Sequence, residues 1–168
     1  MFQILKIFIL CFLPCLTYAA INTTTDSSSL PLHIVADSSF IDYKNSISTY
    51  EGNVKVDQGD SHLTADRIVT KNNVHHKMEE AIAYGMKNLA VFVTTPKPGD
   101  DIINAKARII KFYPIKSLVV LEKDVMVSQG KNNFHGPMII YNIKNQTINA
   151  PASKSGQATI VIEPDKIQ

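Results

Sequence analysis

The amino-acid sequence contains one pattern twice, and this repeat constrains the fold more than any other feature. Residues Ser46 to Thr70 align without a gap with Ser117 to Tyr141, at an offset of 71 residues. One copy of such a unit cannot bury its apolar face alone, so the repeat predicts two copies, stacked or folded face to face, in a jellyroll or β-solenoid with one continuous interior. The matched positions are Glu51, Val54, Val56, Gln58, Gly59 and Ile68 with Glu122, Val125, Val127, Gln129, Gly130 and Ile139, and Ile47 and Leu63 with Leu118 and Phe134.

Apolar residues alternate with polar ones through much of the chain. Val54 and Val56, for example, alternate with Asn53, Lys55 and Asp57. This period of two predicts strands that are buried on one face only. Turn-forming sequences separate the runs at intervals of roughly 8 to 12 residues, which is typical of short antiparallel strands. These turns are expected at Tyr43–Ser46, Glu51–Asn53, Gln58–Asp60 and Lys71–Asn73, and the fold class is therefore expected to be all-β.

The second half of the chain continues the β pattern. The window His75–Tyr84 is the one helix-compatible segment, and we expect a loop or strand there. Pro96–Asp101 is expected to be a loop, because its prolines cannot donate a ladder hydrogen bond. Further strands are expected at Ala90–Thr95, Ile102–Phe112, Lys116–Leu121, Val125–Gln129, Pro137–Ile143, Thr147–Ala150 and Ala158–Glu163.

The first residues have the features of a secretory signal peptide. Lys6 precedes an unbroken apolar run from Ile7 to Leu16, and small residues follow at the positions that a signal peptidase inspects. We expect cleavage after Ala19, although an uncleaved membrane anchor is the alternative. The apolar run is shorter than the roughly 20 residues that cross a bilayer. The expected organisation is a signal peptide at 1–19, a flexible leader at 20–30, one domain at 31–163 and a tail at 164–168.

The mature chain is expected to lack cysteine, since Cys11 and Cys15 both lie in the signal segment. An exported protein without cysteine has no disulfides, so its fold must depend on apolar burial and backbone pairing. Thiolate chemistry and cysteine zinc sites are excluded for the same reason. The formal net charge of +2 gives no electrostatic basis for binding nucleic acid.

Few polar clusters suggest chemistry. His75 and His76 precede Glu79–Glu80, but neighbouring residues of a strand point to opposite faces, which disfavours a metal site. The sequence has no nucleophile elbow, phosphate-binding glycine loop or zinc-protease motif. We therefore expect no enzymatic activity, metal or cofactor. The acidic pairs Asp57 with Asp60 and Asp100 with Asp101 coincide with turn signals, where aspartate is common.

Several segments together resemble the OstA-like family of periplasmic proteins. In the first copy they are Leu32–Asp37, Gly52–Gly59 and Leu63–Asp66, and in the second Ser117–Leu121 and Val125–Gly130. The resemblance extends from Leu32 to Glu163. It implies a twisted, V-shaped β-jellyroll of about 16 short antiparallel strands in the periplasm, whose interior holds the acyl chains of lipopolysaccharide. The second copy departs from the pattern at Lys123–Asp124 and Gly136–Pro137, so its turn geometry is expected to differ.

The resemblance also implies which residues contact the lipid. Alternation selects the inward positions, although inward Val, Ile and Phe residues are ordinarily plain core. Lys55, Lys106, Lys111 and Lys116 are candidates for contact with lipid phosphates, and ordinary solvated faces explain them equally. The expected lipid-binding residues are Leu32, Ile34, Ile41, Val54, Val56, Leu63, Phe92, Phe112, Leu118, Val120, Val125, Val127, Phe134 and Ile139.

An open jellyroll leaves two edge strands whose backbone groups can pair with another chain. The expected partner at the N-terminal edge is an LptC-like inner-membrane protein. At the C-terminal edge it is an LptD-like outer-membrane protein or another copy of this chain. The expected edge residues are Leu32, His33, Ile34 and Val35 at one end and Ala158, Thr159, Ile160, Val161 and Ile162 at the other. The alternatives are an LptC-like anchored component and a structural β-solenoid without lipid cargo.

Overall fold

The chain folds into antiparallel β-strands. The computed structural model describes residues 30–96, 98–145, 147–153 and 156–162. The expected signal peptide, the leader up to residue 29 and the tail 164–168 lie outside these ranges. Within them there are twelve strands and one 3-10 turn, η2 (Pro114–Lys116). The strands are β1 (His33–Val35), β2 (Ser38–Asp42), β3 (Ile47–Gln58), β4 (Ser61–Asn72), β5 (Met78–Tyr84), β6 (Ala90–Thr94), β7 (Ile103–Ala107), β8 (Ile109–Tyr113), β9 (Leu118–Gln129), β10 (Asn132–Asn142), β11 (Thr147–Asn149) and β12 (Thr159–Val161).

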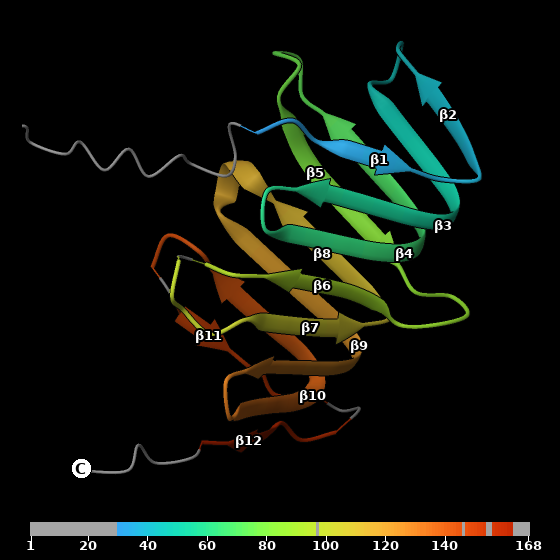
Figure 1. Ribbon diagram of the computed structural model, residues 1–168. Coiled ribbons are helices and arrows are strands. Elements are labelled where there is room, and N and C mark those ends of the chain that lie inside the picture. The colour runs from blue at the N-terminus through green and yellow to red at the C-terminus, as the bar shows by residue number, and fades with distance from the viewer. Residues whose placement is uncertain (1–29, 97, 146, 154–155, 163–168) are drawn as a thin grey trace, which may run out of the picture.

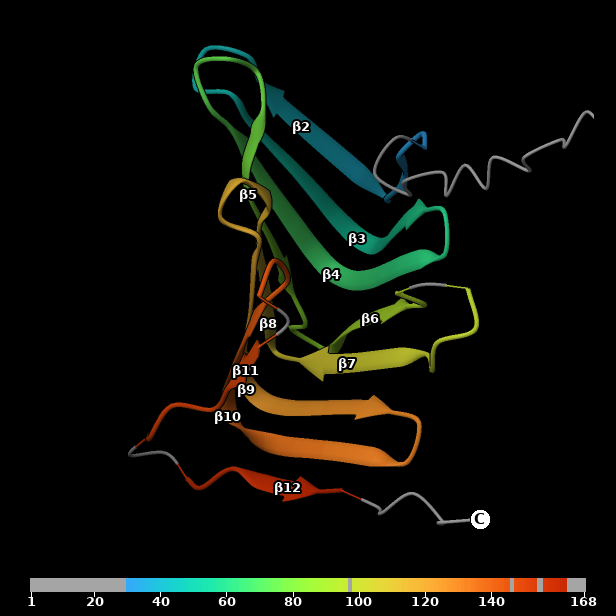
Figure 2. The same cartoon turned by 90° about the vertical axis from the view of Figure 1, so that its left-hand side faces the viewer.

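One hydrogen-bonded sheet folds into two layers (Figures 1 and 2). The long strands β3, β4, β9 and β10 each contribute one half to either layer. Layer A contains β1, β6, β7 and β12 with the β3, β4, β9 and β10 segments 54–58, 61–65, 125–129 and 132–136. Layer B contains β2, β5, β8 and β11 with the remaining halves. Figure 2 shows the layers diverging from the bend, and the V-shaped all-β jellyroll expected from the sequence is confirmed.

The buried core follows the bend between the layers. Small alanines on β5, β6 and β7 allow the layers to meet there, because interiors pack closely only where side-chain volumes fit. Among the described residues no polar side chain belongs to this buried set. The core consists of Val54, Ile68, Ala83, Ala90, Ala105, Ala107, Ile110, Leu121, Val125 and Ile139, each at most 6% exposed.

Two successive residues with positive φ make the bend in each copy. In β3 they are Gly52 at φ 79° and Asn53 at φ 48°, and the pairing with β4 shifts register at this point. In β9 they are Lys123 at φ 63° and Asp124 at φ 55°. The different turn geometry expected for the second copy is therefore wrong. The expected turn at 51–53 is also corrected, since these residues lie inside a continuous strand.

The same contacts secure both bends. The Asp37 amide donates to the Gly52 carbonyl over 3.0 Å, and the Arg108 amide donates to the Lys123 carbonyl over 2.9 Å. The side chains also meet: Asn53 donates to Asp37 over 2.9 Å, whereas Arg108 donates to Asp124 over 3.1 Å. All these positions are related by the 71-residue offset. In the first copy the bend residue Asn53 is the donor, and in the second copy the bend residue Asp124 is the acceptor, so the contact is retained with donor and acceptor interchanged.

The repeat extends further than the aligned sequence indicated. Strands β1, β2 and β3 occupy the places of β7, β8 and β9 with the same pairings at the same offset. The two copies are stacked along one axis, with β1 and β2 at one end and β12 at the other (Figure 1). A stack of two copies confirms the prediction drawn from the repeat.

Three sequence-based boundaries are corrected. The expected strand 102–112 is interrupted at Arg108, which separates β7 from β8. The expected strands 116–121 and 125–129 are parts of one strand, β9. The count of about 16 strands is not confirmed, because twelve strands are present in the described residues and four of them run through the bend into both layers. The window 75–84 is a turn followed by strand β5, so the expected loop or strand is present there.

The part of the chain that the structure describes contains no helix with the length and apolar character needed to cross a membrane.

The two bends allow a matched test of the backbone requirement. Gly52→Ala is expected to destabilise the protein by about 2 kcal/mol or more, because an L-residue resists positive φ and a Cβ at position 52 would lie 2.8 Å from the Asp37 Cβ. The equivalent Lys123→Ala is expected to change stability by less than about 0.5 kcal/mol, since that position already carries a side chain. Urea unfolding of both variants measures the difference, and equal losses would contradict this account of the bend.

Candidate functional site

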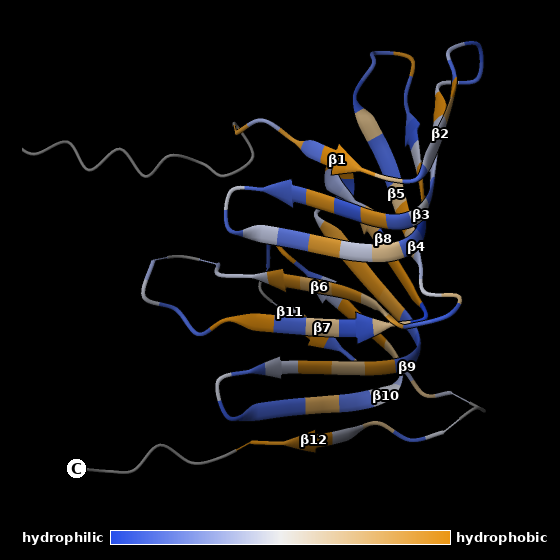
Figure 3. Cartoon of the chain, turned by 45° about the vertical axis from the view of Figure 1, so that its right-hand side comes forward, coloured by the Kyte–Doolittle hydropathy of each residue, from blue (hydrophilic) through white to orange (hydrophobic). Residues whose placement is uncertain are grey.

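A continuous row of apolar side chains runs along the inner face of layer A. Its members are direct partners in the sheet, one from each of eight neighbouring strands. With strands about 4.8 Å apart, the row extends roughly 34 Å from one end of the stack to the other. We call this row the inner ladder; it consists of Ile34, Val56, Leu63, Phe92, Ala105, Val127, Phe134 and Ile160. Figure 3 shows the alternation of apolar and polar residues along strands such as β3 that produces it.

Layer B faces the ladder with two inward rows. The row beside the bend includes Tyr50, Ile68, Ala83, Ile110, Leu121 and Ile139. The row further from the bend consists of Ile41, Ser48, Thr70, Ala81, Phe112, Val119, Tyr141 and Ile148. The side chains beside the bend are mostly buried, whereas Phe112 is 36% exposed and Ile41 and Ile148 are each 45% exposed. The interior is closed at the bend and accessible towards its opening.

One step nearer the opening of layer A, polar residues replace the ladder on β3, β4, β6, β9 and β10, whereas Ile103 of β7 keeps an apolar side chain there. Gln58 lies opposite Ser61, and Gln129 lies opposite Asn132. The Ser61 and Thr94 hydroxyls are 2.8 Å apart and share a hydrogen bond between β4 and β6. The apolar inner surface of layer A is therefore bounded by the bend on one side and, except at Ile103, by hydrogen-bonding side chains on the other.

Most of the residues expected to bind lipid lie on these inward rows. The structure places nine there: Ile34, Ile41, Val56, Leu63, Phe92, Phe112, Val127, Phe134 and Ile139. Val54 and Val125 lie in the buried core at the bend. Leu32 precedes β1 and is 44% exposed. Contact of any of them with a lipid stays a prediction.

Leu118 and Val120 lie on the opposite face, so their expected inward position is wrong. Val119 packs against the core instead, whereas Val120 is paired with Lys111 on the outer face of layer B. The four residues from 118 to 121 are all apolar, and an unbroken apolar run carries no period-two signal.

The outer face of layer B carries a partly buried ion pair. Lys111 Nζ donates a hydrogen bond to Glu122 Oε1 over 2.6 Å, and this bond raises the pKa of the lysine. Burial, and then a hydrogen bond with Glu80, raises the pKa of Tyr113. Lys55 and Lys106 lie on the outer face of layer A. Of the lysines proposed to meet lipid phosphates, these three lie away from the interior.

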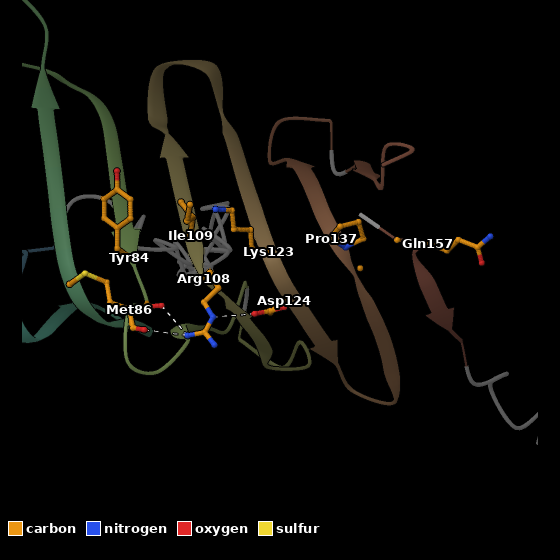
Figure 4. A pocket seen from close by; sticks show the side chains of 11 residues that line it. Tyr84, Met86, Arg108, Ile109, Lys123, Asp124, Pro137 and Gln157 are labelled. Atoms are coloured by element: carbon orange, nitrogen blue, oxygen red, sulfur yellow. Dashed lines mark hydrogen bonds and ion pairs between the residues drawn. The ribbon is translucent and has the colours of Figure 1, made fainter. Parts of the chain in front are cut away.

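The outer side of the second bend contains a hollow of about 830 Å³ (Figure 4). The Arg108 guanidinium beside it donates to Asp124 over 3.1 Å and to the carbonyl groups of Gly85 and Met86 over 3.3 and 3.5 Å. Through these hydrogen bonds Arg108 connects the second bend to the loop between β5 and β6. The hollow lies on the face opposite the inner ladder, and its arginine has a structural role.

The other polar clusters from the sequence are separated by the fold. His75 and His76 lie in an exposed turn, where the His75 amide donates to the Asn73 side chain over 2.9 Å. Asp57 lies 2.6 Å from His62 rather than being paired with Asp60. Asp100 and Asp101 lie in the exposed β6–β7 loop. Within the described ranges no three His, Cys, Asp or Glu side chains are grouped as metal ligands.

Within the described residues both ends of the stack present edge strands: β1 pairs only with β3 and β12 only with β10, and β2 and β11 are the corresponding edges of layer B. Of the expected edge residues, Leu32, Ala158 and Ile162 lie just outside β1 and β12, and the others lie within them. Pairing of these edges with another chain stays a prediction. Apolar side chains are unusually exposed at these ends. They include Val35, Phe40, Ile41, Ile148, Ile160, Val161 and Ile162, which are between 45% and 68% exposed.

Comparisons with known proteins identify close relatives. Residues 33–147 match the family model described as "LptA/(LptD N-terminal domain) LPS transport protein". The lipopolysaccharide export system protein LptH of Pseudomonas aeruginosa is 29% identical over 143 residues, which cover 81% of each chain. The export protein LptA of Escherichia coli K12 is 28% identical over 145 residues, 86% of this chain and 77% of that one. A crystal structure of LptH, the LptA-homologous periplasmic component of the P. aeruginosa lipopolysaccharide transport device, aligns with a TM-score of 0.73 at 27% identity, covering 82% of this chain and 99% of that one.

Adjacent valines of β9 test which residues face inward. Val119→Asp is expected to lower the free energy of unfolding by about 2 kcal/mol or more, because it places a carboxylate against the core. Val120→Asp makes the same chemical change on the outer face beside Lys111, and a loss below about 1 kcal/mol is expected. Thermal or urea unfolding compares the two variants. A larger loss for Val120→Asp would show that the inward rows are assigned in the wrong phase.

Proposed function

The chain belongs to the family of LptA and LptD amino-terminal-domain lipopolysaccharide transport proteins, and on this premise we propose that it is a periplasmic bridge that carries lipopolysaccharide along its inner ladder from the inner to the outer membrane. The observation that carries this proposal is the apolar row with one residue from every strand of layer A. Its relatives are lipopolysaccharide export proteins, which disfavours both an anchored component and a β-solenoid without lipid cargo. Transport of this kind makes and breaks no covalent bond, so the proposed role is non-enzymatic.

The ladder suits a cargo that must move. Shielding an acyl chain from water is worth about 0.8 kcal/mol per methylene, or roughly 9 kcal/mol for a dozen carbons. Because each ladder residue is apolar and the next lies one strand spacing away, an acyl chain that shifts along the stack exchanges one apolar neighbour for another. The side chains of the ladder offer no polar group that would trap the chain at one position.

The join between the two copies supports end-to-end association. Within the chain, β6 pairs with β7 in layer A and β5 pairs with β8 in layer B. β12 occupies the place of β6, since Ile160 pairs with Phe134 as Phe92 pairs with Leu63. β1 occupies the place of β7. The C-terminal edge of one molecule and the N-terminal edge of the next therefore match the two sides of a join that already exists inside the chain.

The pairing of β6 with β7 and of β5 with β8 inside the chain predicts the register in which two molecules would pair end to end. Phe92 lies opposite Ala105, and the repeat converts this pair into Ile160 opposite Ile34 of the next molecule. In layer B, Ala81 lies opposite Phe112, which becomes Ile148 opposite Ile41 of the next molecule. Both derived pairs join apolar residues on inward rows, so the ladder would continue across the joint. The two edges are unlike, and such head-to-tail pairing can extend through several copies.

The remaining partners follow from the same edges. An LptC-like inner-membrane protein is proposed to pair with β1 at the N-terminal edge. An LptD-like outer-membrane protein, or another copy of this chain, is proposed to pair with β12 at the C-terminal edge. Cleavage after Ala19 would release the mature protein into the periplasm, the compartment named for LptH.

Photo-crosslinking at neighbouring positions of β6 tests the lipid path. A photoreactive residue in place of Phe92 is expected to label lipopolysaccharide, because Phe92 lies in the inner ladder. The matched control replaces Val93, whose side chain points to the outer face, and only background labelling is expected there. Adducts are detected by immunoblotting for lipopolysaccharide. Equal labelling from both positions would contradict an inner path.

Engineered cysteine pairs test the register of the joint. When one batch of protein carries Ile160→Cys and another Ile34→Cys, oxidation of the mixture is expected to give a disulfide-linked dimer, since directly opposed residues lie within reach of a disulfide. The pair Ile148→Cys and Ile41→Cys is expected to behave in the same way. Ile160→Cys with Val35→Cys is the control, because these side chains would point to opposite faces. Dimer formation only in the control would refute the derived register.

A further inference from the structure

The four turns at the outer border of layer B share one composition. They connect β2 to β3, β4 to β5, β8 to β9 and β10 to β11. Each turn contains an exposed apolar residue and an exposed lysine close to it. The apolar residues Tyr43, Val74, Ile115 and Ile143 are 86%, 89%, 59% and 43% exposed, and the lysines are Lys44, Lys77, Lys116 and Lys144. We call this border the basic rim.

Strand pairing places the four turns next to one another along a single border. The Asn72 amide donates to the Ser46 carbonyl over 3.0 Å, which links the first turn to the second. The Ile143 amide donates to the Ser117 carbonyl over 2.8 Å, which links the third turn to the fourth. β5 pairs with β8 between them. Successive turns are two strands apart, or roughly 10 Å, and Figure 2 shows them following one another along the same side of layer B.

The carboxylates nearest to the rim are those of Asp42, Glu79 and Glu80, and each of them contacts another group: Asn45, Lys71 and Tyr113, respectively. The turn segments 43–46, 73–77, 114–117 and 143–145 contain four lysines and no aspartate or glutamate. Asp42 lies just before the first turn, and its carboxylate accepts hydrogen bonds from Asn45, which lower its pKa. No ion pair in the described part of the chain involves any of the four lysines. Lys116 lies 5.4 Å from the centre of the Tyr113 ring, a contact that leaves its charge in place.

The opposite border has a different character. The β3–β4 turn and the β6–β7 loop of layer A carry the exposed residues Asp60, Asp100 and Asp101. Lys131 lies in the remaining turn of this border, and Lys97 falls outside the described residues. The two borders of the opening therefore differ in charge, and an anionic group at the mouth of the interior would favour the side of layer B.

We propose that the basic rim binds the phosphate groups of the lipopolysaccharide cargo and so fixes the side on which the headgroup lies. This inference rests on the proposed function, because it places the anionic part of the same ligand. The inward row of layer B that lies further from the bend leads from the interior to the rim. Its member Phe112 is two residues before the β8–β9 turn and is partly exposed. A molecule with acyl chains next to phosphates would meet apolar side chains first and ammonium groups next. Regular spacing of the turns would offer a moving headgroup an equivalent contact at each step.

The test compares two variants that lose the same charge. The rim variant is Lys44→Gln, Lys77→Gln, Lys116→Gln and Lys144→Gln. The control variant is Lys55→Gln, Lys87→Gln, Lys106→Gln and Lys123→Gln, at positions on the outer face of layer A or near the bends. Each mature protein is titrated with purified lipopolysaccharide and with the same lipid after enzymatic dephosphorylation, at low and high salt. Circular dichroism checks that both variants are folded.

The wild-type protein and the control variant are expected to prefer the phosphorylated lipid by roughly tenfold at low salt and to lose this preference at high salt. The rim variant is expected to bind both lipids equally, with the affinity of the wild type for dephosphorylated lipid. A rim variant that keeps the preference would overturn the inference, and so would a control variant that loses it. If the wild type binds neither lipid, the proposed function itself fails. Loss of binding to anionic phospholipid vesicles by a rim variant that still prefers phosphorylated lipid would reassign the rim to membrane contact.

Discussion

The structure depends on a backbone constraint: four long strands must change layers without breaking their hydrogen bonds. β4 and β10 change layers with no residue of positive φ, so the sharpest change of backbone direction is made in their partners β3 and β9. Two successive residues in the left-handed region at Gly52–Asn53 and at Lys123–Asp124 supply the change of direction and shift the register at the same point. The carbonyl at the first of these residues is then satisfied by an amide from the neighbouring connection, at Asp37 or Arg108. The bend is thus part of the hydrogen-bonded sheet rather than an interruption of it.

The open interior follows from this bend. Layers joined along one line can be close-packed only near that line, and the fully buried residues are found there. Further away the layers diverge, so the same inward alternation that gives a core at Val54 and Ile68 gives partly exposed apolar side chains at Ile34 and Phe112. Exposed inward apolar surface is costly in water, and this cost is what makes the interior receptive to an apolar ligand. The described residues contain no cysteine, and the opening is sustained there because the bend and the ladder pairings set the angle between the layers.

The sequence predicted the parts of the fold that follow from local pattern. The repeat, the all-β class and most of the inward positions come from alternation and spacing, which act over a few residues. The failures have definite causes. The run from Leu118 to Leu121 has no polar residue to reveal its phase, and Lys123–Asp124 hides a left-handed pair behind residues that seldom adopt it. Asp37 bonds to Asn53 at the first bend, and Arg108 bonds to Asp124 at the second. This correspondence becomes visible only when both the 71-residue offset and the contact at the first bend are known.

The incomplete ends are the last consequence of building one unit twice. Repeat proteins usually protect their terminal units with a polar outer face, yet here the terminal strands expose Ile41, Ile148 and Ile160. The same positions inside the chain are covered, because β6 meets β7 and β5 meets β8 across the join between the copies. Each end of the stack therefore exposes to solvent apolar side chains of the kind that pack against a neighbouring strand inside the chain. The three-residue length of β1, β11 and β12 limits that exposure, whereas pairing with the opposite edge of another molecule would remove it and continue the ladder.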